Sequence, residues 1–263
     1  MFRTTEISDP KFESNHLRFI TIKSKNLKGR GDICLFVPPG KVLEEVPLVI
    51  LLHGVYGSSW VWTQKGGVHI TALDMMSRDE IKPMVIAMPS DGLWGDGSAY
   101  LAHNNRDFEQ WIVNDVRTAV INNIEGVTKK SKVCIGGLSM GGFGALRLGI
   151  KYSGVFSAIS AHSAITAIDQ MPLFVEEPLQ NFVQDTNEEN AVLPLAISKK
   201  NNLPKIRFDC GREDLLIDHN RALHQGLLEN AIEHKYEEFS GAHEWPYWQE
   251  HIKDSLRFFN STI

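Results

Sequence analysis

The chain has 263 residues, of which 43% are hydrophobic and 22% are charged, and its formal net charge is -5. These values are ordinary for a globular protein that buries a core, and no lysine and arginine cluster gives the footprint of a nucleic-acid-binding surface. The longest apolar run, PLVILLHG at 47–54, is much shorter than the roughly 20 residues of a membrane-spanning helix, so we expect no membrane partner.

The first fifteen residues are polar and include acidic side chains, so we expect no signal peptide and a cytoplasmic protein. The cysteines, Cys34, Cys134 and Cys210, are odd in number, lie in or beside apolar runs and form no C-x-x-C motif. This pattern favours buried free thiols in a reducing compartment. No histidine pair has the H-E-x-x-H spacing, and we predict neither a metal nor another cofactor.

Strand and helix patterns alternate along the chain. Residues 16–24 and 31–39 alternate apolar and polar side chains, as antiparallel strands do. Short continuous apolar runs, typical of parallel strands buried on both faces, follow at 47–54, 82–90, 132–139, 155–163 and 205–211. Helical patterns occupy 69–80, 106–124, 141–153, 218–232 and 244–260. The alternation predicts an α/β fold with a doubly wound, mostly parallel sheet and antiparallel N-terminal strands.

One long segment, residues 164–204, departs from this alternation. It is irregular and contains prolines, and unstructured segments of this length inside compact domains are often lids or binding loops. The sequence has no internal repeat, low-complexity tract or linker. We therefore expect a single domain over residues 1–263, with a lid-like insertion around 164–204.

The pentapeptide GLSMG, at 137–141, matches the motif G-x-S-x-G between a predicted strand and a predicted helix. In that setting the chain turns so sharply that side chains two residues on either side of the serine would clash, hence Gly137 and Gly141. The N-terminus of the following helix favours negative charge beside the serine. The context favours Ser139 as a nucleophile over a chance tight turn.

A nucleophilic serine needs a base, and the base needs a group that orients it. In this arrangement the chain order is serine, acid, histidine. Among the downstream histidines, His243 lies in a loop between a predicted strand and the last helix, where it can reach Ser139. For the acid we choose Asp214, in the turn beyond a predicted strand, with Glu213 as the alternative.

The oxyanion of an acyl-transfer reaction needs two hydrogen-bond donors. The first is predicted to be the backbone N–H of Met140, directly after the serine. The second should come from the turn after the strand at 47–54, where Val55 N–H is our choice and Tyr56 N–H the alternative.

Six segments carry a family resemblance: LLHGVYGSSWVW, MPSDGLWGDGS, FEQWIVNDV, GLSMGGFGALRLG, CGREDLL and GAHEWPYWQEHI. Over about residues 30–260 the chain resembles the esterase D group of α/β-hydrolases. This group includes tributyrin esterases, S-formylglutathione hydrolases, antigen 85-type mycolyltransferases, and the acetyl xylan and feruloyl esterases of carbohydrate esterase family one. The segments HGVYGS and SDGLWGDGS are most similar to the bacterial acetyl xylan or feruloyl-type esterases.

The resemblance implies an α/β-hydrolase fold with Ser139, Asp214 and His243 as catalytic triad, and with Val55 N–H in the oxyanion hole. S-formylglutathione hydrolases usually have histidine before the serine, where this chain has Leu138. We expect a serine carboxylesterase that hydrolyses short-chain or aromatic acyl esters of sugars through an acyl-enzyme. The alternatives are an acyltransferase with the same triad and an S-formylglutathione hydrolase-type thioesterase.

The expected partner is a small-molecule ester, for instance an acylated oligosaccharide; the sequence leaves the oligomeric state open. Trp60, Trp94 and His162 are expected to contact the substrate, since they follow strand ends where ligands bind in open α/β sheets. Trp245 and Trp248 flank the last helix and are expected to pack against the core.

Overall fold

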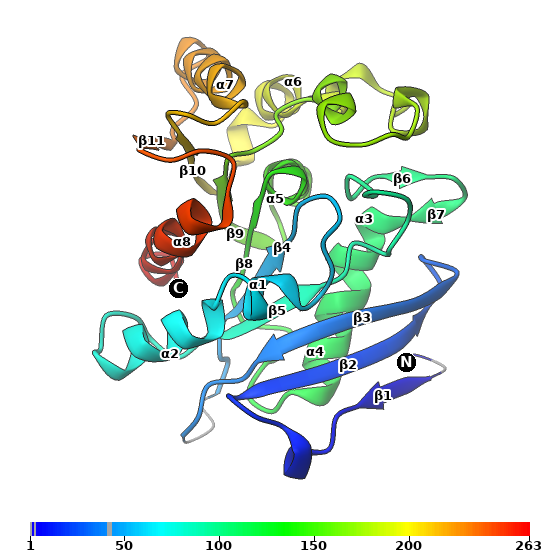
Figure 1. The fold of residues 1–263 in the computed structure, drawn as a ribbon, viewed down its shortest axis with the longest axis vertical. Helices are drawn as coiled ribbons and strands as arrows, with labels where there is room; N and C mark the ends of the chain where they lie inside the picture. Colours follow the sequence, from blue (N-terminus) through cyan, green and yellow to red (C-terminus); the bar gives the residue numbers. More distant parts are fainter. Residues whose placement is uncertain (1, 3, 41–43) are drawn as a thin grey trace.

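The computed structural model describes residues 2, 4–40 and 44–263. Within these residues lies a nine-stranded sheet with the order β1-β2-β3-β5-β4-β8-β9-β10-β11 (Figure 1). Its strands are β1 (Thr5–Ile7), β2 (Leu17–Ser24), β3 (Gly29–Phe36), β4 (Leu48–Leu52), β5 (Val85–Pro89), β8 (Val133–Leu138), β9 (Phe156–His162), β10 (Lys205–Gly211) and β11 (Lys235–Phe239). Two short strands, β6 (Ala102–His103) and β7 (Arg106–Asp107), pair as a separate hairpin.

The predicted fold class is confirmed. Strands β1, β2, β3 and β5 pair in antiparallel fashion, and every pairing from β5 through β4, β8, β9 and β10 to β11 is parallel. The sequence did not predict β1. Its three residues are all exposed, so no buried face leaves a hydrophobic pattern, and only the pairing with β2 defines the strand.

Helices cover both faces of the sheet, as Figure 1 shows. They are α1 (Val61–Gln64), α2 (Val68–Ser77), α3 (Phe108–Gln110), α4 (Arg117–Asn123), α5 (Met140–Lys151), α6 (Val192–Ser198), α7 (Ile217–Glu229) and α8 (Trp245–Asn260). A π-helical turn, η2 (Trp111–Val116), joins α3 to α4 where the sequence predicts one regular helix.

Side chains of the central strand β4 alternate between two hydrophobic clusters. Ile50 packs in the cluster that contains Phe143 of α5, whereas Val49 and Leu51 pack in the cluster that contains Ile252 of α8. Every residue of β4 is buried. Burial on both faces explains why the parallel strands have continuous apolar sequences.

The insertion at 164–204 consists mostly of short helical turns. These are η3 (Ile168–Leu173), η4 (Leu179–Asn181), η5 (Asn187–Asn190), α6 and η6 (Lys200–Asn202). The buried guanidinium of Arg147, on α5, pairs with Glu109 Oε2 at 2.5 Å and with Glu189 of the insertion. This ion-pair network ties the insertion to the helix that follows Ser139.

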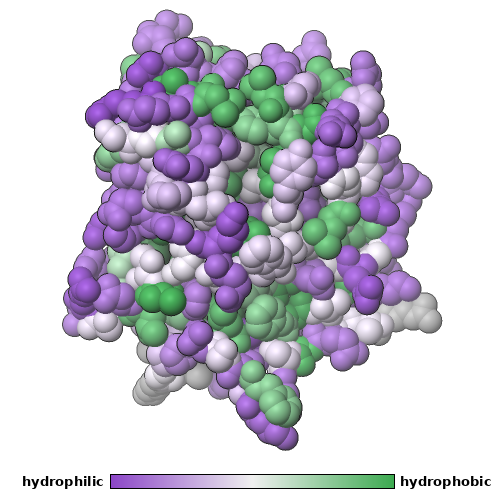
Figure 2. Space-filling model, viewed as in Figure 1, coloured by the Kyte–Doolittle hydropathy of each residue, from purple (hydrophilic) through white to green (hydrophobic). Residues whose placement is uncertain are grey.

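None of the helices in the described part of the chain is long and apolar enough to cross a membrane. Hydrophilic and hydrophobic residues are interspersed over the face shown in Figure 2. All three cysteines are buried free thiols, as expected.

The turn from β8 to α5 brings backbone segments into close contact. A Cβ atom on Gly137 would overlap the carbonyl group of Gly141, and a Cβ atom on Gly141 would overlap the carbonyl groups of Leu52 and His53. These neighbours are backbone atoms of β4, of the residue after it and of α5, and they cannot rotate away as a side chain can. The spacing of the glycines in G-x-S-x-G therefore follows from steric exclusion at this turn.

We predict that Gly141→Ala lowers the free energy of unfolding by at least about 1–3 kcal/mol, the usual effect of overpacking a closely packed site. Gly154→Ala is the matched control, because a Cβ atom there would meet no atom within 4 Å. Urea unfolding of the two variants provides the comparison. Equal stability of both variants would show that the backbone at the turn relaxes freely.

Candidate active site

Ser139 has a backbone conformation that is rare for a residue with a side chain. Its φ and ψ angles are 55° and -121°. The Ser139 N–H donates to the carbonyl of His162 at 3.0 Å, and the Ser139 carbonyl accepts from the N–H of Phe143 and of Ile165. These three hydrogen bonds hold the strained residue between β8, α5 and the segment after β9.

The structure brings Ser139, His243 and Asp214 into one hydrogen-bonded row. Ser139 Oγ lies 2.9 Å from His243 Nε2, and His243 Nδ1 lies 2.9 Å from Asp214 Oδ2 and 3.1 Å from Asp214 Oδ1. In Figure 1 the start of α5, the segment leading into α8 and the loop after β4 lie close together near the centre of the view. An imidazole held in this way can accept the serine proton while the carboxylate fixes its tautomer.

The Asp214 carboxylate is almost fully buried. Burial favours the neutral acid, but the hydrogen bond and charge of His243 outweigh it and lower the pKa of Asp214 below its ordinary value. Its Oδ1 also accepts from Leu216 N–H at 2.8 Å. Glu213, the alternative acid, instead accepts the Gly241 N–H at 2.6 Å and so supports the loop that carries His243.

Aromatic rings enclose the His243 imidazole. The Phe174 ring, from the insertion, lies 5.1 Å from it at an interplanar angle of 32°, and the Trp248 ring lies 5.0 Å away at 90°. Together with the contact to Asp214, these rings fix the plane of the imidazole relative to Ser139.

Two backbone N–H groups next to Ser139 are available as donors. Among residues 2, 4–40 and 44–263, neither Val55 N–H nor Met140 N–H has an acceptor. The alternative donor, Tyr56 N–H, is engaged with the Asp96 carbonyl at 2.8 Å. Two N–H groups that have no acceptor and lie beside a serine hydroxyl form the arrangement that stabilises an oxyanion.

The side chain of His53 supports the peptide that carries the Val55 N–H. His53 Nε2 accepts from Asp91 N–H at 3.0 Å, so this nitrogen carries no proton. The proton is therefore on Nδ1, which lies 2.7 Å from the Gly54 carbonyl and donates to it. That carbonyl belongs to the same peptide unit as Val55 N–H, so the hydrogen bond fixes the direction of both groups.

A cavity of about 300 Å³ opens beside Ser139. Residues of four regions line it: the loop after β4, the turn at Ser139, the insertion and the start of α8. They are Gly54, Val55, Tyr56, Gly57, Trp60, Val61, Lys65, Leu138, Ser139, Phe174, His243, Trp245 and Trp248. The Tyr56 hydroxyl donates to the Phe174 carbonyl at 2.7 Å and links the insertion to the loop after β4.

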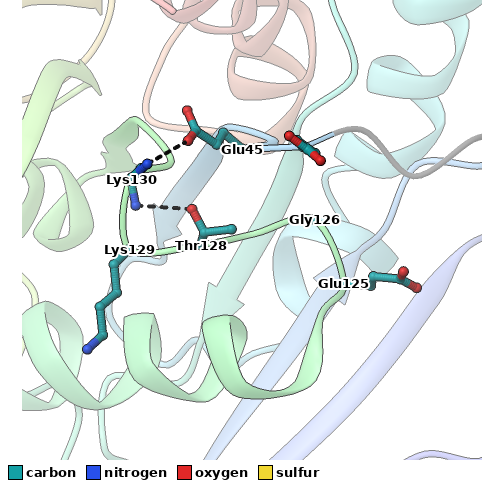
Figure 3. Close-up of a pocket in the computed structure, with 7 residues that line it drawn as sticks. Glu45, Glu125, Gly126, Thr128, Lys129 and Lys130 are labelled. Atoms are coloured by element: carbon teal, nitrogen blue, oxygen red, sulfur yellow. Dashed lines mark hydrogen bonds and ion pairs between the residues drawn. The ribbon is translucent and has the colours of Figure 1, made fainter.

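A larger cavity, of about 660 Å³, lies at the other end of the sheet. Its described lining includes Glu45, paired with Lys130 at 3.9 Å, together with Glu125 and Lys129 (Figure 3). These residues precede β4 and β8, whereas ligands of open α/β sheets bind beyond the carboxyl ends of the strands. The cavity beside Ser139 is therefore the candidate active site.

Two predicted substrate contacts need correction. His162 is buried, with Nδ1 2.8 Å from Asp209 Oδ2 and Nε2 2.7 Å from Ser255 Oγ, and it does not line the cavity. The half-buried Trp94 ring packs edge-on against His103 and Phe182, outside the cavity lining. His162 is the last residue of β9 and Trp94 lies in the loop after β5, but both side chains turn into the core.

Trp60 lines the cavity with 46% of its surface exposed, in agreement with its predicted location. Trp245 and Trp248 pack as expected, but they also line the cavity, and their proximity to His243 in the sequence could have indicated this. The sequence did not indicate that Phe174 and Lys65 line the cavity, because neither belongs to a recognisable motif.

A family model described as a putative esterase matches residues 24–259. The acetyl esterase of Caldicellulosiruptor saccharolyticus is 28% identical over 268 residues, which cover 92% of this chain and 97% of that protein.

Solved structures with the same fold include a ferulic acid esterase, with a TM-score of 0.81, 22% identity and coverage of 98% of this chain and 99% of the other. The S-formylglutathione hydrolase of Agrobacterium tumefaciens has a TM-score of 0.80, 15% identity and coverage of 99% of each chain. The fluorophosphonate-binding serine hydrolase F of Staphylococcus aureus has a TM-score of 0.78, 18% identity and coverage of 92% and 97%.

We predict that the Val55 peptide acts through its N–H and not through its side chain. Val55→Pro removes the N–H and should lower kcat for ester hydrolysis about 10²–10³-fold, the usual effect of losing one oxyanion donor. Val55→Ala keeps the N–H and should change kcat only slightly. Steady-state kinetics on both variants, with circular dichroism to verify folding, gives the comparison; equal losses would instead point to side-chain packing.

Proposed function

The chain belongs to the esterase family whose model matches residues 24–259, and on that premise we propose a serine carboxylesterase that acts on short-chain or aromatic acyl esters of sugars. The proposal assigns Ser139 as nucleophile, His243 as base and Asp214 as orienting acid. The observation that carries it is the row of contacts from Ser139 Oγ through His243 to Asp214, beside two N–H groups that have no acceptor in the described chain.

In the proposed reaction, His243 Nε2 takes the proton of Ser139 Oγ as the oxygen attacks the ester carbonyl. The Val55 and Met140 N–H groups donate to the oxyanion of the tetrahedral intermediate. His243 then protonates the departing alcohol, which leaves an acyl group on Ser139. A water molecule, deprotonated by the same imidazole, releases the acid and restores the serine.

The size and lining of the cavity support small acyl groups. A volume of about 300 Å³ lies at the lower end of the range for ligand pockets, and aromatic side chains form much of its wall. Flat indole rings such as those of Trp60 and Trp245 suit an aromatic acid or a sugar ring. The names of the acetyl esterase and ferulic acid esterase relatives agree with this choice.

We also propose that residues 164–204 act as a lid of a single catalytic domain. Phe174 of this insertion contacts His243, and its carbonyl accepts the Tyr56 hydroxyl. A second hydrogen bond connects the insertion to the loop after β5: the Asp96 N–H donates to the Glu177 carboxylate at 2.8 Å. The lid would enclose the acyl group and exclude bulk water from the acyl-enzyme.

We predict that Ser139→Ala lowers kcat for an acetyl ester by about 10⁴-fold or more while the protein stays folded, because removal of the nucleophile leaves only binding and oxyanion stabilisation. Ser157→Ala, on β9 and outside the cavity lining, is the control and should keep activity. Near-normal turnover by a pure Ser139→Ala preparation would contradict the proposed mechanism.

We predict that kcat/KM for acetyl and feruloyl sugar esters exceeds that for long-chain acyl esters, because the cavity holds a short or flat acyl group. The measurement is a panel of esters with one alcohol and acyl groups of increasing length. A preference for long chains would refute the proposed substrate class but not the triad. Adding an alcohol acceptor to the same assay tests the acyltransferase alternative, and a formyl thioester tests the thioesterase alternative.

A further inference from the structure

Lys65 is a charged residue in the described lining of the candidate active site that the proposed chemistry does not use. It follows α1 and lines the same cavity as Ser139 and His243. Its N–H donates to the Val61 carbonyl at 3.0 Å, and its carbonyl accepts from Gln249 Nε2 at 2.7 Å. Its backbone is therefore held between α1 and α8 at a fixed place on the cavity rim.

The Lys65 ammonium group rests on an aromatic wall. Nζ lies 5.5 Å from the centroid of the Trp245 ring, within the range of a cation–π contact. Trp245 itself lies edge-on between Trp62 and Trp248, at 5.9 Å and 5.3 Å, so the ring that supports the ammonium is well fixed.

No carboxylate neutralises this ammonium within the described residues, since Lys65 takes part in no ion pair there. The exposed Glu244, which precedes Trp245, likewise forms no ion pair within them. The described lining of the cavity contains no aspartate or glutamate, and Lys65 is its one lysine or arginine. The cavity thus combines aromatic walls with a single positive charge in a chain whose net charge is -5.

We propose that Lys65 makes this active site selective for esters that carry a carboxylate next to the sugar or aromatic ring. The ring would lie against the indoles of Trp60 and Trp245, and the carboxylate would pair with the ammonium at the rim. The carboxylate could belong to the alcohol, as in a uronic acid, or to the acyl group, as in a half-ester of a dicarboxylic acid. The inference rests on the proposed esterase function, because it concerns the same cavity.

The test measures kcat/KM for two pairs of esters. The first pair is an acetylated methyl glucoside and the corresponding acetylated methyl glucuronoside, which place the charge in the alcohol. The second pair is nitrophenyl benzoate and the nitrophenyl half-ester of terephthalic acid, which place it on the aromatic acyl group. The readout is the ratio of anionic to neutral kcat/KM within each pair.

We expect the ratio for at least one pair to fall about two- to fivefold in Lys65→Met, which keeps the apolar stem, since an exposed charge pair contributes modestly. Lys65→Glu should lower that ratio further. Lys253→Met, on α8 outside the cavity lining, is the matched control and should keep the wild-type ratio. In the wild-type protein the same ratio should fall as salt is raised, because salt screens exposed charges.

A ratio that is the same in wild type, Lys65→Met and Lys65→Glu for both pairs would overturn the inference. Hydrolysis of the neutral esters in that case would leave the proposed esterase function intact. If no ester of either pair is hydrolysed by the wild-type protein, the proposed function itself fails. The pair whose ratio changes identifies which part of the substrate carries the carboxylate.

Discussion

The active site depends on the close backbone contact where β8 turns into α5. Gly137 and Gly141 allow the turn to pack against the end of β4, and this packing holds Ser139 at a φ of 55°. The same contact sets Ser139 beside the loop that follows β4, whose Val55 N–H has no acceptor in the described chain. One steric constraint thus positions Ser139, the helix N-terminus behind it and the N–H groups of Val55 and Met140 together. Because β4, β8, β9, β10 and β11 are parallel, their carboxyl ends lie at one edge of the sheet and bring the loop after β4, Ser139, Asp214 and His243 together there.

A buried polar network holds in place the two elements that flank Asp214 and His243. Asp209, on β10, accepts from the Tyr247 hydroxyl at 2.6 Å and from Arg207 at 2.6 Å. Burial alone would raise the pKa of Asp209, but the charges of His162 and Arg207 lower it to about 2, so the carboxylate stays ionised near neutral pH. Tyr247 lies in the first turn of α8, four residues after His243. The network therefore anchors α8, which follows the loop that contains His243, to β10, which precedes Asp214.

Much of this arrangement could be predicted from the sequence, because its signals are local. Continuous apolar runs identify the parallel strands, and G-x-S-x-G requires the turn that the structure contains. The exposed β1 and the helical turns of 164–204 lack such patterns. The side chains of His162 and Trp94 turn inward because of Asp209, Ser255 and Phe182, which are distant in sequence. Contacts of this kind, like those that bring Phe174 and Lys65 to the cavity, depend on tertiary packing and leave no signal in the neighbouring residues.

Covalent labelling with a fluorophosphonate tests the central claim most directly, because a serine activated by a base displaces fluoride from phosphorus far faster than an ordinary hydroxyl group does. The account predicts one label per chain, on the peptide that contains Ser139, with activity lost in proportion to labelling. His243→Ala should label far more slowly, since the base that activates Ser139 is missing. Complete labelling with full activity, or a label on another residue that accompanies inactivation, would contradict the account.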